Sequence, residues 1–181
     1  MSPRLVLHEH VPIYRVVRAG WERPLDSSFS QHKTGNRWNT ADFPALYCCC
    51  SPPVARIIAR DFWRLSGVEM NELQGSYRPR LIEVLWSGNV VDVASEQGMI
   101  EAGLPPAYPD GVTKDRTRQL AAEWHGAGYE GVLCRSASLA RLGFRAWEDP
   151  HQPWGEIAIF TGKAHGQPQP GQPLIDFDWE G

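Results

Sequence analysis

The sequence lacks the excess of positive charge that nucleic-acid-binding proteins carry. It has 18 lysines and arginines against 21 aspartates and glutamates, a formal net charge of −3 and a pI near 6.1. Binding to DNA or RNA phosphates needs a basic surface, so we predict no direct contact with nucleic acid. Only Lys33, Lys114 and Lys163 are lysines. Arginine, whose planar guanidinium binds carboxylates and phosphates through paired hydrogen bonds, supplies nearly all the positive charge.

Long apolar segments are missing as well. The N-terminal stretch MSPRLVLHEHVPIYRVV contains His8, Glu9 and His10 where a signal peptide would need an unbroken apolar core. No stretch approaches the roughly 20 apolar residues of a membrane-spanning helix. We therefore expect a cytoplasmic protein that makes no membrane contact.

Cysteine is scarce, and its spacing suits neither cross-links nor metal binding. Of the four cysteines, Cys48, Cys49 and Cys50 are consecutive. Successive residues of a strand point to opposite faces, so these three cannot converge on one metal ion. Their spacing fits no disulfide framework either. We interpret them as small buried apolar residues in a reducing compartment, and we predict no metal cofactor.

The length and the periodicity of the chain predict one α+β domain. With 181 residues and 42% hydrophobic side chains, the chain can bury a single sizeable core. From Thr161 onward the sequence is rich in glycine, glutamine and proline. This composition indicates a domain over residues 1–161 and an extended tail over 162–181, whose end LIDFDW can dock back. We predict a mixed or antiparallel sheet flanked by helices, with strand patterns at 11–18, 80–86, 89–93, 129–136 and 155–160 and helical patterns at 51–65, 94–103 and 114–126.

The segment 35–65, GNRWNTADFPALYCCCSPPVARIIARDFWRL, combines several features of a binding site. Arg37 precedes a strand-like run that contains Tyr47, and Ser51 before two prolines is a strong signal for the start of a helix. A helix N-terminus that faces an arginine-bearing loop is suited to a phosphate or pyrophosphate. The alternative is structural, with Arg37 a surface charge and Tyr47 an ordinary core residue. The loop before this segment, from 19 to 36, is long enough to be functional.

Taken in order, these pieces resemble the RES domain, a family named for an arginine, a glutamate and a serine. The family includes the toxins of RES–Xre toxin–antitoxin pairs. The resemblance extends over about residues 11–161. It is carried by YR at 14–15, PL at 24–25, GNRWN at 35–39, ALY at 45–47, GYEGVLCRS at 128–136 and WGEIAIF at 154–160.

The resemblance implies an ADP-ribosyltransferase-like α+β fold that binds NAD as its substrate and breaks the nicotinamide–ribose bond. Phosphate, water or a protein side chain would be the acceptor. By motif position, Arg15 and Arg37 would hold the pyrophosphate and ribose side of NAD, Tyr47 would pack on the nicotinamide, and Ser136 would hydrogen-bond the dinucleotide. Cleavage leaves positive charge on the ribose, so the site also needs a carboxylate. The implied partner is an Xre-type antitoxin, and an oligomer with that antitoxin is compatible with the resemblance.

The sequence departs from the family pattern at the glutamate. That residue normally lies eleven residues beyond the tyrosine, where this chain has Ile58. Asp61 is the only carboxylate nearby and lies close to the same helix face. Either the helix register is shifted, or Asp61 substitutes, or catalysis has been lost. We therefore take Arg37, Asp61 and Ser136 as candidate catalytic residues. The alternative function is a catalytically impaired NAD- or nucleotide-binding protein that acts through a partner.

Overall fold

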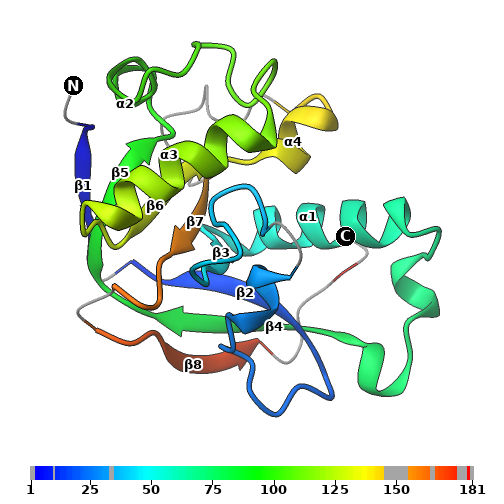
Figure 1. Ribbon diagram of the computed structural model, residues 1–181. Helices are drawn as coiled ribbons and strands as arrows, with labels where there is room; N and C mark the ends of the chain where they lie inside the picture. Colours follow the sequence, from blue (N-terminus) through cyan, green and yellow to red (C-terminus); the bar gives the residue numbers. More distant parts are fainter. Residues whose placement is uncertain are drawn as a thin grey trace.

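A computed structural model describes residues 3–9, 11–32, 35–144, 155–163, 166–174 and 179. Within these residues one eight-stranded sheet has the strand order β1-β5-β6-β7-β3-β2-β4-β8, and its helices lie against one face (Figure 1). Neighbouring strands are antiparallel except β5 and β6, which run parallel. The predicted α+β class with a mixed sheet is therefore confirmed.

The elements follow one another along the chain with short connections in most places. The strands are β1 (Leu5–His8), β2 (Ile13–Arg18), β3 (Leu46–Cys49), β4 (Pro79–Leu85), β5 (Gly88–Val93), β6 (Gly131–Arg135), β7 (Gly155–Ile159) and β8 (Gln169–Leu174). The α-helices are α1 (Pro52–Leu65), α2 (Glu96–Glu101), α3 (Lys114–Gly126) and α4 (Ala137–Arg141), and short 3₁₀ turns are η1 (Ser28–Gln31), η2 (Met70–Glu72) and η3 (Gly75–Tyr77).

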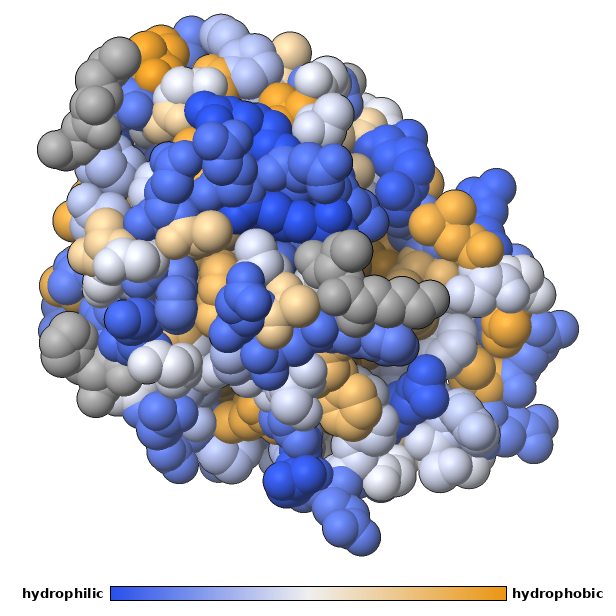
Figure 2. Space-filling view, viewed as in Figure 1, coloured by the Kyte–Doolittle hydropathy of each residue, from blue (hydrophilic) through white to orange (hydrophobic). Residues whose placement is uncertain are grey.

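The helices cover one face of the sheet in two groups. Helices α2 and α3 pack on β5, β6 and β7 through residues such as Met99, Leu120 and Trp124. Helices α1 and α4 pack on β2, β3 and β4 through Val54 and Leu139, among others. The outward side of α3 is hydrophilic, as Figure 2 shows, in keeping with its many charged residues. Strand β3 contributes to both groups, with Tyr47 in the first and Cys49 in the second, and its neighbour β7 contributes Ala158 to the first.

The opposite face of the sheet encloses a second apolar core. Val84 of β4 and Val90 of β5 belong to the same buried cluster, together with Ile13, Leu46 and Ile157. Strands β4 and β5 stand far apart in the strand order, so the sheet must curve strongly to bring these side chains together. Alternation along each strand therefore decides whether a side chain faces the helices or this enclosed core.

Most predicted elements are found where the periodicity placed them. Helix α3 has the predicted bounds, and α1 ends at Leu65 before Gly67, whose φ of 73° lies in the left-handed region. The short β1 and α4 were not predicted. The tail predicted from 162 contributes β8, which pairs with β4 at the sheet edge, where its two prolines are tolerated.

The end of the tail lies partly outside the described residues. Residues 175–178 of the predicted docking segment are among those not described, whereas Trp179 packs against the core under α1. In the described part of the chain, no helix combines the length and apolarity needed to span a membrane.

Candidate functional site

The loop 35–39 presents Arg37 in a fixed position because its own residues hold it. Gly35 has φ +79°, and a Cβ there would lie 2.3 Å from the Asn39 carbonyl oxygen, so only glycine fits. The buried Asn39 side chain donates to the carbonyls of Ser30 (2.8 Å) and Phe43 (3.2 Å). Its Oδ1 accepts from the backbone N–H of Asn36 (3.2 Å). The GNRWN motif therefore folds around its last asparagine.

Helix α3 fastens the same loop from outside. The Arg118 guanidinium donates from Nε to the Asn36 carbonyl at 3.0 Å and from Nη2 to the Gly35 carbonyl at 3.1 Å. Asp115, one turn earlier on α3, pairs with Arg118 at 3.0 Å. A loop held at both of these carbonyls and by Asn39 loses little conformational entropy when it binds a ligand.

Tyr47 of β3 closes the loop against the sheet. Its hydroxyl donates to Asn39 Oδ1 at 2.9 Å and accepts from the Trp38 N–H at 2.9 Å. Burial raises the pKa of this phenol, and the nearby Arg37 opposes the rise. The hydroxyl is thus committed to the loop, and the half-buried ring is the part of Tyr47 that a ligand can meet.

Glu156 of β7 is a carboxylate close to Arg37 and Ser136. It was not among the candidates predicted from the sequence. Strand alternation puts it on the same face as Ala158, which is paired with Tyr47 across β3 and β7. Its carboxylate accepts a hydrogen bond from the Ser136 hydroxyl and lies in the field of Arg37. Burial raises the pKa of the Glu156 carboxyl, and Ser136 and Arg37 oppose that rise. As whole residues, Arg37 and Glu156 keep intermediate exposure.

Ser136 lies at the end of β6, as predicted, and serves two neighbours there. Its Oγ accepts a hydrogen bond from the Leu139 N–H at 3.2 Å and so caps α4. The same hydroxyl donates a hydrogen bond to the Glu156 carboxylate. The residue is fully buried. Both hydrogen-bonding functions of its hydroxyl are therefore occupied. The Arg37 cluster, as we name it, consists of Arg37, Tyr47, Tyr108, Ser136 and Glu156.

Arg37 Nη1 is buried and has no hydrogen-bond partner among the described residues. The Trp38 and Tyr108 ring centroids lie 6.0 Å apart, and these two side chains interact through their polar ends. The charge of Arg37 acts on the Tyr108 phenol. Because native proteins rarely leave a buried donor unpaired, Arg37 Nη1 points to a bound group that supplies the missing partner.

Arg15 lies on the other face of the sheet, with Ile13 and Val17. Its Nε donates to the Pro24 carbonyl at 2.9 Å and its Nη1 to the Tyr47 carbonyl at 3.1 Å, and its guanidinium lies 6.0 Å from the Trp21 ring centroid. Burial lowers the pKa of Arg15. Arg15 thus joins the 19–30 loop to the back of β3, directly behind Tyr47.

Asp61 and Ile58 lie on α1, and their described contacts are with α4 and the core under α1. The Asp61 carboxylate is buried and pairs with Arg141 of α4. None of the contacts in the described residues joins Asp61 to Arg37, Tyr47 or Ser136. Ile58 packs in the core under α1 and borders a hollow of about 310 Å³ that Val16, Ala59 and Phe62 also line. Helix α1 therefore presents an apolar side chain at the family's glutamate position.

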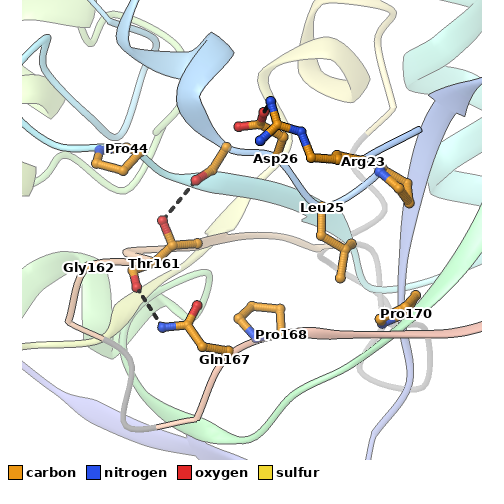
Figure 3. Close-up of a pocket in the computed structure, with 11 residues that line it drawn as sticks. Arg23, Leu25, Asp26, Pro44, Thr161, Gly162, Gln167, Pro168 and Pro170 are labelled. Atoms are coloured by element: carbon orange, nitrogen blue, oxygen red, sulfur yellow. Dashed lines mark hydrogen bonds and ion pairs between the residues drawn. The ribbon is translucent and has the colours of Figure 1, made fainter. Parts of the chain in front are cut away.

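A second, larger hollow of about 520 Å³ lies beside the 23–27 loop (Figure 3). Its polar groups are paired with one another. Arg23 bonds Asp26 at 3.2 Å, the Ser27 and Thr161 hydroxyls are 2.8 Å apart, and the Gln167 amide donates to the Thr161 carbonyl at 3.3 Å. This hollow offers a ligand fewer unpaired donors than the Arg37 cluster does, so we do not place the site here.

The cysteines are free thiols without a role in disulfide or metal binding among the described residues. Cys48, Cys49 and Cys134 are buried, all four cysteines are free, and burial raises the pKa of Cys48 and of Cys50 to about 12. Such thiols are unreactive at neutral pH. No group of histidine, cysteine or acidic side chains in the described ranges is arranged to hold a metal ion.

The fold is shared with a solved toxin–antitoxin structure. The chain is similar to a chain of the crystal structure of the M.tuberculosis MbcT–MbcA toxin–antitoxin complex, with a TM-score of 0.69 and 18% identity, over 90% of this chain and 82% of that one. At this identity the likeness establishes a common fold. Residues 12–180 match the RES domain family, and the chain belongs to it, which confirms the predicted resemblance. No curated protein matches the sequence significantly.

Proposed function

We propose that this protein is a RES-type toxin that binds NAD and cleaves its nicotinamide–ribose bond in the cytoplasm. Membership of the RES family and the fold shared with a toxin–antitoxin structure support the general class. The observation that carries the proposal is Arg37, whose Nη1 is buried without a partner among the described residues and whose charge acts on the carboxylate of Glu156. A guanidinium with a free donor suits a pyrophosphate, and a carboxylate beside it suits the positive charge that develops on the ribose.

The proposal gives each site residue a role that its contacts allow. Arg37 binds the pyrophosphate, and the Tyr47 ring packs on the nicotinamide, because the Tyr47 hydroxyl is occupied by the loop. Ser136 positions Glu156 and contacts the dinucleotide only if that hydrogen bond is released. Arg15 acts from behind the sheet by fixing the Tyr47 backbone. The pairing of Asp61 with Arg141 favours a structural role in joining α1 to α4.

The test is nicotinamide release by the purified protein. NAD is supplied with water alone, with added phosphate and with a protein mixture as acceptor, because all three acceptors would use the same grip on NAD. We expect release in at least one condition, and the productive condition identifies the acceptor. No release in any of them would rule out the enzyme.

A second candidate function is favoured by Ile58. An isoleucine at the family's glutamate position would suit a chain that keeps the nucleotide site and has lost turnover, acting through a partner. The two candidates differ in one measurable respect. The binding protein takes up NAD in calorimetry and returns it intact, whereas the enzyme converts it.

The proposed partner is an Xre-type antitoxin that silences the toxin by blocking access to NAD. The toxin–antitoxin context of the structural neighbour supports a partner of this kind. Co-purification with the product of an adjacent helix-turn-helix gene, and loss of nicotinamide release in the complex, would establish it. A neighbouring gene product that neither binds nor inhibits would argue against this partner.

A further inference from the structure

Glu156 occupies a position in the sheet where a glutamate needs a reason. It lies in β7 between β6 and β3, paired with Cys134 on one side and Cys49 on the other. The rest of the strand is apolar, and Ile157, Ala158 and Ile159 are fully buried. An ionised carboxylate in such surroundings costs folding free energy unless partners or a function compensate.

The neighbours of Glu156 orient its carboxylate and favour its ionised form, as stabilising a positive charge requires. The Ser136 hydroxyl donates a hydrogen bond that orients the Glu156 carboxylate. The positive charge of Arg37 favours the ionised carboxylate and so opposes the rise in its pKa that burial causes. No lysine or second carboxylate faces it among the described contacts. The titratable groups around it, from β3, β6, the 35–39 loop and the segment before α3, are Arg37, Tyr47, Cys49, Cys50, Tyr108 and Cys134. Because burial raises the pKa of the five neutral groups and keeps them protonated, Glu156 is the one group among these that carries negative charge when ionised.

We propose that Glu156 is the catalytic carboxylate of this chain and performs from β7 the task for which α1 offers only Ile58. This inference rests on the proposed cleavage of NAD. The bond between nicotinamide N1 and ribose C1′ breaks, and its electron pair leaves on the nicotinamide nitrogen. The ionised Glu156 stabilises the positive charge left on C1′ and O4′. When water is the acceptor, its oxygen then bonds to C1′ and gives a proton to Glu156, which releases it to solvent. The products are nicotinamide, ADP-ribose and one proton.

Asp61 is a weaker choice on geometry. Its carboxylate is buried against Arg141, whereas Glu156 shares its surroundings with Arg37 and faces the same side of the sheet as Tyr47. A carboxylate that must leave an ion pair before it reaches substrate gains nothing from its position on α1. Glu156 needs no such rearrangement.

The test compares Glu156→Gln, Glu156→Asp and a matched control, Glu83→Gln. Glu83 is a half-buried strand glutamate in the same row across the sheet, since Glu83 pairs with Tyr14 and Tyr14 pairs with Cys49. Three strand spacings, about 14 Å, separate it from Glu156. Nicotinamide release gives kcat and KM, and calorimetry gives the affinity for ADP-ribose.

We expect Glu156→Gln to lower kcat at least about a hundredfold, the usual contribution of a positioned acid–base group, with KM and ADP-ribose affinity changed less than threefold or so. Glu156→Asp moves the carboxylate by about 1 Å and should also lose on the order of a hundredfold. Glu83→Gln should match the wild type. If Glu156→Gln fails to fold, Glu156→Asp carries the test.

The pH profile separates chemistry from structure. Because the ionised form is the active one and its pKa is raised by burial, the wild-type kcat should climb as pH rises above the ordinary glutamate range, and this limb should vanish in Glu156→Gln. Wild-type turnover that persists in a folded Glu156→Gln would overturn this inference and leave NAD cleavage standing. A wild type that binds NAD without releasing nicotinamide would overturn both.

Discussion

Replacing Arg37 by alanine tests how this site recognises NAD. The change should leave the loop in place, because Asn39 and Arg118 hold it through backbone carbonyls that the substitution does not touch. What disappears is a guanidinium whose Nη1 is buried without a partner until a ligand arrives. A hydrogen bond to a charged group is worth about 1.5–3 kcal/mol. The affinity for the pyrophosphate should therefore fall roughly 10- to 150-fold.

The assay is calorimetry with ADP-ribose, which carries the pyrophosphate and cannot release nicotinamide. Arg37→Lys keeps the charge but loses the paired donors, so its affinity should lie between wild type and alanine. Arg64→Ala, an exposed arginine on α1, controls for the loss of one positive charge. Unchanged affinity in a folded Arg37→Ala would assign Arg37 a structural role and would remove the basis for placing NAD at this cluster.

Three further predictions address the carboxylates and the cell. Asp61→Asn should lower the melting temperature by about 2–4 °C, because the ion pair with the half-exposed Arg141 contributes roughly 1 kcal/mol. Nicotinamide release should stay within a few-fold of wild type. Loss of that release would make Asp61 catalytic. Glu156→Gln should melt at a higher temperature than wild type at pH 7–8, and this difference in melting temperature should shrink toward pH 4. The reason is that the native state, with its raised Glu156 pKa, binds the proton more tightly than the unfolded state, so wild-type stability falls as pH rises from the unfolded pKa through the folded one. A difference in melting temperature that does not change with pH would contradict this. Expression without the antitoxin should deplete NAD and arrest growth, and normal NAD at high levels of folded protein would contradict the toxin assignment.

Periodicity was sufficient to predict much of the fold. Helix α3 could be read from Leu120, Ala121 and Trp124, and α1 from Ser51 and the two prolines after it, because these signals are local. Strand β1 and helix α4 were missed because each is too short to show a period. Strand β8 was missed because its prolines and glycine are typical of a loop, and only the free edge of β4 makes them part of the sheet.

The site was harder to predict because its partners come from distant segments. Alternation correctly separated Tyr14 from Arg15, but the sequence could not say that Arg15 would bond the backbone behind Tyr47. Glu156 sits in a run that reads as a buried strand, where a single acid looks like an interruption. Its functional role depends on Ser136 and Arg37, which come close to Glu156 because β7 pairs with β6 and with β3. A charged residue inside an apolar strand was the available signal.

The most direct test of the account is a single-turnover experiment with the protein in excess over NAD. Under these conditions even a slow catalyst converts every bound molecule once, and product release cannot hide the chemical step. The account predicts that nicotinamide appears in the same molar amount as NAD is lost, and that at equal protein concentration Glu156→Gln slows this conversion at least about a hundredfold. Arg37→Ala should convert less NAD because it binds less of it. NAD that is fully bound by the excess wild-type protein and yet remains intact would contradict it.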